Sequence, residues 1–204
     1  ATLGMMNICR ALIYFVSGGK WVNSYEMTAE YIGLANWNVG GISSLVWIAI
    51  LIFLLFGYFL KYNRTGRKIY AIGSNLQAAS VSGISSRRIT FLVYLFMGGL
   101  AGLGGMLWIS RYAYASFEVV TSYEISVIAA CVLGGISITG GSGKLTGVLF
   151  GVLLLGIIDA ALPMIQVSSF VKETLEGLII LVAIVVNVGM ERRAKKAVLK
   201  SRII

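Results

Sequence analysis

A polar segment, Gly66-Arg-Lys-Ile-Tyr-Ala-Ile-Gly-Ser-Asn-Leu-Gln-Ala-Ala-Ser-Val-Ser-Gly-Ile84, separates two long apolar runs of this chain. Lys and Arg residues flank it on both sides, and no acidic residue occurs between Glu30 and Glu118. Short basic loops between membrane spans stay in the cytoplasm. We therefore expect residues 61–88 to form a cytoplasmic loop.

Within this loop the sequence predicts one short helix that lies outside the membrane. Ser74 and Asn75 offer an N-terminal cap, residues 76–82 have a helix-tolerant composition, and Gly83 offers a C-terminal stop. A helix held at the membrane surface between two spans is well placed to contact another subunit. Our hypothesis is that it forms a docking surface.

The composition indicates an integral membrane protein. Of the 204 residues, 58% are hydrophobic and only 12% are charged, and the mean hydropathy is +0.88. A soluble domain of this length carries about twice as many charges. The net charge of +9 lies in blocks beside apolar runs rather than on one continuous face, which argues against nucleic acid as a partner.

Hydropathy predicts an all-α, polytopic transmembrane bundle with about six membrane segments in a single domain, residues 1–204. The expected segments are 2–16, 42–60, 89–109, 125–136, 145–162 and 177–188. Segment 42–60 has no charged residue and approaches the ~20 residues needed to cross a bilayer. Segment 125–136 is short, so either its helix begins earlier, near Ser122, or it is a broken span.

The distribution of Lys and Arg predicts the orientation of these segments. Thirteen of them fall on one side of the alternating segments and three on the other, which assigns the thirteen to the cytoplasm. Residues 191–204 then form a basic cytoplasmic tail, and both chain ends are cytoplasmic. The thirteen are Lys61, Arg64, Arg67, Lys68, Arg87, Arg88, Lys144, Arg192, Arg193, Lys195, Lys196, Lys200 and Arg202, against Lys20, Arg111 and Lys172.

Several kinds of chemistry are disfavoured. Without His or a Cys cluster we expect no metal site, no cofactor and no catalytic residues. Cys9 and Cys131 are predicted to be separate buried thiols. Gly140-Gly-Ser-Gly-Lys144 resembles part of a phosphate loop, but Ile138 and Leu145 stand where that motif needs Gly and Ser or Thr. It is interpreted as a Gly-rich turn between two helices.

A few polar residues inside the apolar segments are candidates for a solute pathway. They are Asn7, Arg10, Glu124 and Asp159. Each can also be explained by burial at a helix contact or by reaching to the membrane interface. Arg10, near the middle of its segment, is the strongest candidate.

The chain resembles the C-terminal part of a membrane permease subunit of the ribose-type, simple-sugar ABC importers, which also include autoinducer-2 importers. The most diagnostic match is Gly66-Arg67 followed by Tyr70-Ala71, Gly73, Asn75 and Ala78-Ala79. The other matching runs are 2–10, 17–20, Ser82-Gly83-Ile84, Tyr123-Glu124, 128–130, 132–135, Gly140-Gly141, Gly143-Lys144, Gly147 and 167–169. Where the family commonly has Gly, Asp and an Asn-Asn pair, this chain has Ser74, Ser126 and Asp159.

The resemblance implies a permease that carries a monosaccharide or related polar solute across the bacterial inner membrane and is not itself an enzyme. It implies three protein partners: ATP-binding-cassette ATPase subunits, a second permease copy forming a homodimer or heterodimer, and an extracytoplasmic solute-binding protein. It also implies the residues that couple to the ATPase. These are Gly66, Arg67, Tyr70, Ala71, Gly73, Asn75, Ala78, Ala79, Ser82, Gly83 and Ile84.

Other functions stay open at this stage. The alternatives are a branched-chain amino acid type of ABC permease, an ion-gradient-driven secondary carrier, and a structural membrane anchor for an ATPase. The chain is poor in the buried carboxylates that proton- or sodium-driven carriers use. Because it opens with Ala1 directly in an apolar run, we expect it to be N-terminally truncated.

Overall fold

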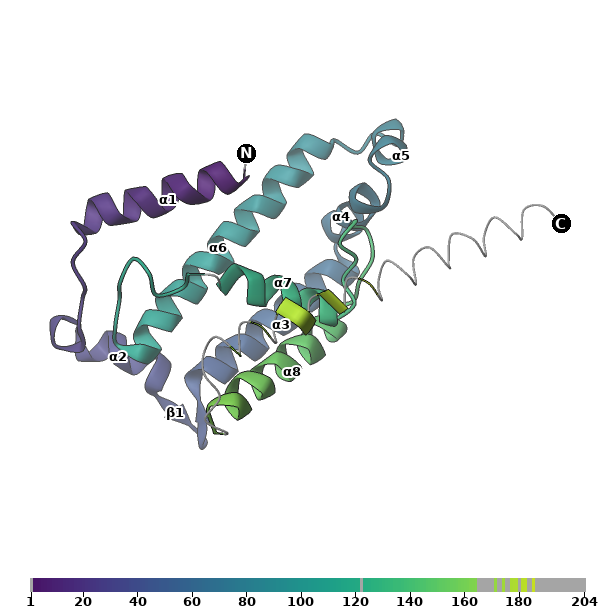
Figure 1. Cartoon of the computed structure of the whole chain (residues 1–204). Helices are drawn as coiled ribbons and strands as arrows, with labels where there is room; N and C mark the ends of the chain where they lie inside the picture. Colours follow the sequence, from purple (N-terminus) through teal and green to yellow (C-terminus); the bar gives the residue numbers. More distant parts are fainter. Residues whose placement is uncertain are drawn as a thin grey trace. The chain divides into compact units, whose positions relative to one another are not determined.

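The computed structural model describes residues 2–121 and 123–164, and beyond them residues 171, 174, 177–179, 181, 182 and 185. The described chain is mainly helical, as Figure 1 shows. It divides into two compact units: Ala1–Arg67 with Ser85–Thr121, and Lys68–Ile84 with Ser122–Ile204. We call them the first and the second unit.

The first unit contains three long helices and several short elements. Its elements are α1 (Thr2–Ser17), the 3-10 helix η1 (Ser24–Glu26), α2 (Ala29–Asn36), β1 (Asn38–Val39), β2 (Ile42–Ser43), α3 (Ser44–Tyr62) and α6 (Ser86–Tyr112). The strands β1 and β2 form a two-residue antiparallel hairpin that leads into α3. The helix α4 (Arg64–Ser74) begins in this unit and continues into the second.

The short helix α2 joins the beginning of α3 to the end of α6. Ser110, near the end of α6, is completely buried, and its hydroxyl donates to the Tyr31 carbonyl (2.6 Å) and accepts from the Ala35 N–H (3.0 Å). On the α3 side, the Ser44 hydroxyl donates to the Leu34 carbonyl (2.7 Å). Phe96 of α6 packs edge-on against two phenylalanines of α3. These contacts make α3 and α6 antiparallel neighbours.

The second unit is organised around a tight helix pair. It contains α5 (Leu76–Val81), α7 (Tyr123–Leu133) and α8 (Leu145–Met164). Gly134 lies directly against the backbone of Gly147, and Gly151 lies against the Ala130 carbonyl, so α7 and α8 run antiparallel and their backbones touch at these glycines. Ala129, Ala130 and Leu155 form the buried cluster at this contact. Small residues permit such close approach of helices in membranes.

Three of the predicted membrane segments are confirmed as helices long and apolar enough to span a bilayer: Ser44–Tyr62, Ser86–Tyr112 and Leu145–Leu162. The predicted segments 2–16 and 125–136 correspond to the shorter apolar helices Gly4–Ser17 and Tyr123–Leu133. The segment 177–188 and the basic tail 191–204 lie largely or wholly outside the described residues. The count of about six spans therefore stays a prediction.

The structure corrects three details of the sequence prediction. The α7 helix begins at Tyr123, which agrees with the expected alternative of an earlier start, but it ends at Leu133 and not at residue 136, because Gly135 adopts a positive φ of +79° that ends the helical geometry. A separate helix, α4, precedes the predicted short helix in the 61–88 loop. The stretch between the predicted segments 2–16 and 42–60 contains α2, a helix of eight residues that is stabilised by its packing against α6.

Candidate functional site

The helix α5 is the element that the polar loop was predicted to contain. It begins at Leu76 as predicted and ends at Val81, one residue earlier than predicted. Asn75 is the N-cap, and its side-chain carbonyl oxygen accepts a hydrogen bond from the Ala78 N–H at 3.0 Å. Gly83 has a φ of +76°, and the Ile84 N–H then donates to the Ala79 carbonyl at 3.0 Å. Both ends of the six-residue helix are therefore fixed by local hydrogen bonds.

The surface that α5 exposes differs in part from the predicted one. Ala79 is only 5% exposed, so its side chain is not available to a partner. Leu76 is 55% and Val81 is 89% exposed. We define the exposed α5 surface as Leu76, Gln77, Ala78, Ser80 and Val81. Sequence reasoning emphasised the small residues and missed the two aliphatic ones, although they are the only Leu and Val in the 66–84 segment.

The other predicted coupling residues lie on α4 or at its ends. Gly66 is buried, and a Cβ there would lie 2.7 Å from the Phe59 carbonyl oxygen, so only Gly fits the bend between α3 and α4. Arg67 is exposed and Ala71 is half-buried. The Tyr70 hydroxyl donates to the Gly143 carbonyl at 3.4 Å. Gly73 lies against the backbone of Gly141.

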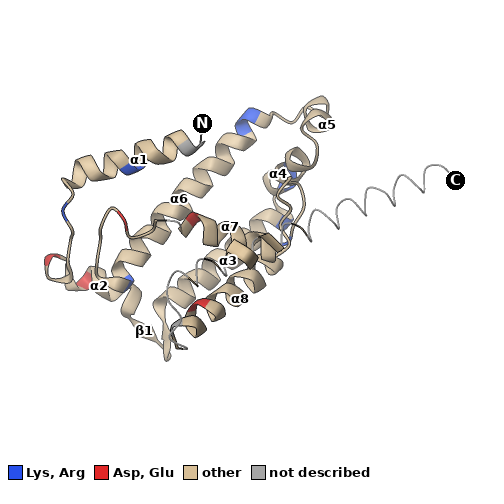
Figure 2. Cartoon of the chain, in the orientation of Figure 1, with Lys and Arg blue, Asp and Glu red and all other residues tan. Residues whose placement is uncertain are grey.

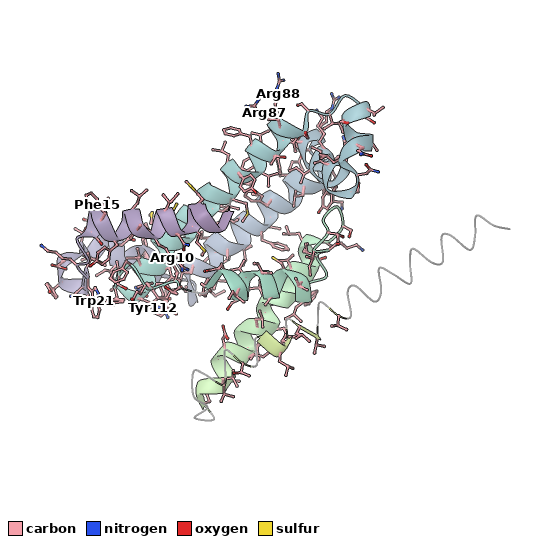
Figure 3. All side chains as sticks on the ribbon, turned by 45° about the horizontal axis from the view of Figure 1, so that its top comes forward. Arg10, Phe15, Trp21, Arg87, Arg88 and Tyr112 are labelled. Carbon is pink, nitrogen blue, oxygen red and sulfur yellow. The ribbon has the colours of Figure 1, made fainter. Side chains whose placement is uncertain are left out.

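Basic side chains gather at one end of the antiparallel α3 and α6 pair of the first unit. Lys61 lies in the last turn of α3, Arg64 begins α4, and Arg87 and Arg88 occupy the first turn of α6. Figure 2 shows that the middles of α3 and α6 carry no charge, and Figure 3 shows Arg87 and Arg88 pointing away from the ribbon. Arg111 lies at the opposite end of α6, where it donates to the side-chain carbonyl oxygen of Asn36.

The solute-pathway candidates fall into two pairs. Asn7 and Arg10 lie one helical turn apart on α1 and are both exposed, in the first unit. Glu124, in the first turn of α7, and Asp159, near the end of α8, occupy the same end of the antiparallel pair in the second unit. The structure thus groups each pair on its own unit.

The described residues contain no group of three His, Cys, Asp or Glu side chains that could hold a metal ion. Cys9 and Cys131 are free thiols, as predicted, but Cys9 is exposed rather than buried. The Gly-rich segment 137–144 forms a turn between α7 and α8, as its sequence predicted, with the Ser137 N–H donating to the Ser142 carbonyl at 3.1 Å. The turn is in direct contact with α4.

Comparison with known families identifies the architecture. Residues 1–186 match the family model described as branched-chain amino acid transport system / permease component. The chain belongs to this permease family. The match covers both units and includes α3, α6 and α8, the three helices that are long and apolar enough to cross a membrane. A helical membrane bundle is the architecture that the family implies for them.

Individual members of the permease family are similar over most of the chain. The L-arabinose transport system permease protein AraH of Escherichia coli K12 is 33% identical over 97% of this chain and 59% of its own length. The ribose import permease protein RbsC of the same strain is 37% identical over 92% of this chain and 59% of its own. The autoinducer 2 import system permease protein LsrC of Salmonella paratyphi B is 32% identical over 89% of this chain and 52% of its own length.

The chain therefore spans between about half and three-fifths of the length of these curated relatives. No solved structure matches it.

Proposed function

We propose that the chain is the transmembrane permease part of an ABC importer that carries a monosaccharide or related small polar solute across the bacterial inner membrane. The observation that carries the proposal is the similarity, over most of the chain, to permeases whose names specify arabinose, ribose and autoinducer 2. Those names favour a sugar-like solute over a branched-chain amino acid. ATP is hydrolysed by separate subunits, and the permease supplies the path.

In this proposal the 61–88 loop is the coupling segment, and a partner ATPase docks on the exposed α5 surface. Two observations support it. The helix is fixed by caps at both ends, so a force applied to it moves it as a body instead of unwinding it. Its exposed Leu76 and Val81 are also unusual in a polar loop and suit burial against another protein.

The cytoplasmic location of the loop is likewise proposed. The clustering of Lys61, Arg64, Arg87 and Arg88 at one end of α3 and α6 supports it, because basic residues are retained on the cytoplasmic side of spans. The helix α2, which joins α3 and α6 at the opposite end of this helix pair, then faces outward. A soluble binding protein would deliver solute on that side. A second permease copy completes the path, and the spans alternate between inward and outward openings.

We further propose that Asn7, Arg10, Glu124 and Asp159 contribute to the solute path. A neutral sugar requires hydrogen-bonding groups rather than a strong net charge. The two pairs supply an amide, a guanidinium and two carboxyl groups from apolar helices, where ionisable residues are rare and often mark a solute path.

The first prediction is that solute uptake is driven by ATP. Cells that carry the full-length permease with its importer partners should take up a labelled monosaccharide from a panel that includes arabinose and ribose. Uptake should fall to background when ATP is depleted with arsenate and should persist when a protonophore collapses the ion gradient. Uptake that survives arsenate but stops with the protonophore would show an ion-driven carrier and contradict the proposal.

The docking surface gives the second prediction. Val81→Asp places a charge in the proposed apolar contact, so we expect co-purification of the ATPase subunit to fall about tenfold or more, while the permease itself stays in the membrane. Val120→Asp is the matched control, because Val120 is another exposed valine, 49% exposed, outside the loop. If the two variants co-purify with equal amounts of the ATPase subunit, α5 is not the docking surface.

A further inference from the structure

The Gly-rich turn 137–144 has no role in the function proposed so far. It connects α7 to α8 and is shaped by three glycines with positive φ: Gly140 at +90°, Gly141 at +75° and Gly143 at +147°. The Ser137 carbonyl accepts the Gly140 N–H at 3.0 Å. At Gly140 and Gly141 no side chain covers the backbone of the turn, so another backbone can approach it closely there.

This turn touches the end of α4 backbone to backbone. A Cβ added to Gly73 would lie 2.6 Å from the Gly141 nitrogen and 2.9 Å from the Gly141 Cα. In the other direction, a Cβ on Gly141 would strike the backbone nitrogen and Cα of Ser74, and one on Gly140 would lie 3.3 Å from the Gly73 carbonyl oxygen. We call Gly73, Gly140 and Gly141 the glycine contact. The Tyr70 hydrogen bond to the Gly143 carbonyl lies beside it.

A contact of this kind transmits displacement with little loss. Side chains between two segments can change rotamer and absorb a shift, but two backbones in direct contact cannot. One side of the glycine contact is continuous, through Ser74, with the N-cap Asn75 of α5. The other side is continuous with α7 and α8, which themselves pack through Gly134, Gly147 and Gly151.

We propose that the glycine contact transmits movement of the ATPase-docking segment to the α7 and α8 pair. Gly73 and Gly141 are then positioning residues for transport: they keep α4, α5, α7 and α8 moving together. Through this pair the movement reaches Glu124 and Asp159 at its far end. The inference rests on the proposed function, because it requires an ATPase that acts on α5.

The test uses the full-length permease reconstituted with its ATPase and binding protein. In Gly73→Ala the new Cβ meets Gly141, and Ala is otherwise favourable in a helix, so any defect comes from the contact. Gly141→Ala probes the other side. Gly135→Ala is the matched control for Gly141→Ala, since Gly135 has nearly the same φ, +79°, but nothing within 4 Å of its Cβ position.

We expect both contact variants to retain the ATPase subunit on purification. Their uptake should fall about tenfold relative to Gly135→Ala, and their ATP hydrolysis should lose its stimulation by the solute-loaded binding protein. Uptake and stimulation equal to those of the control would overturn the inference. So would loss of the ATPase subunit, because the glycine contact would then belong to the docking surface.

A second measurement does not depend on the glycine variants folding. Ser74→Cys and Ser142→Cys, in a background without Cys9 and Cys131, place two exposed thiols on opposite sides of the contact. If both segments move together, joining them with a short thiol cross-linker should leave uptake within about twofold of the untreated protein. Uptake abolished by the cross-linker would overturn the inference. Failure of the proposed function is distinguishable, since the unmodified protein would then show no ATP-dependent uptake.

Discussion

Gly151→Leu is expected to destabilise the permease by about 3 kcal/mol, because the added side chain has no space between α7 and α8. Gly151 is buried, and a Cβ at this position would collide with the Ala130 carbonyl and lie 2.8 Å from the Gly134 nitrogen. The two helices must then separate, which opens the cluster of Ala129, Ala130 and Leu155. The expected result is a lower midpoint of thermal unfolding in detergent, monitored by size-exclusion chromatography.

The control for this variant lies on the same helix. Gly156→Leu adds the same side chain to α8, but a Cβ at Gly156 has nothing within 4 Å. Its unfolding midpoint should stay close to that of the unmodified protein. If Gly151→Leu and Gly156→Leu unfold at the same temperature, the close packing of α7 on α8 does not determine the stability of this region.

Ser110→Val is expected to destabilise the first unit by about 2–4 kcal/mol. The hydroxyl of Ser110 satisfies the Ala35 N–H and the Tyr31 carbonyl of α2 in a completely buried position. Valine has two methyl groups in place of the hydroxyl, so both hydrogen bonds to α2 are lost and an additional carbon must fit into a completely buried position. Together these changes cost more than the loss of a hydrogen bond at the surface. The same thermal unfolding measurement, with protease sensitivity of the 18–41 segment, reports the release of α2.

Ser80→Val provides the comparison. Ser80 is exposed, and its hydroxyl donates only to the Gln77 carbonyl within α5. Water can replace that bond, so the unfolding midpoint should change little. A Ser110→Val protein as stable and as protease-resistant as Ser80→Val would mean that the buried hydroxyl does not hold α2 on α6.

Local signals made part of the site predictable. The Asn75 cap, the six-residue helix and the Gly83 stop depend on residues within one or two turns, and sequence reasoning located all three. The exposure of Leu76 and Val81 was not predictable in this way. Which residues of a short helix are covered depends on the path of the chain around it, and the six residues of α5 are too few for a periodic pattern that would mark Ala79 as buried.

The contacts of the Gly-rich turn were also not predictable from local sequence, because they join residues that are far apart in the chain. Its composition predicted a turn between two helices and excluded a phosphate loop, and the structure has a turn there. Nothing in residues 137–144 indicates that they meet Gly73, which lies more than 60 residues earlier. A glycine offers no side chain whose chemistry could suggest a partner, so only the folded chain brings the two together.

Sequence alone determined that this chain is a helical membrane protein, which runs are apolar enough to span, and where the polar loop places its short helix. Those properties follow from the cost of exposing charges and backbone to lipid, which acts on each segment separately. Tertiary structure decided which faces are buried, how α2 ties α3 to α6, and that α4 meets the α7–α8 turn. Such contacts join residues distant in sequence, and close packing selects them only when the whole chain is folded.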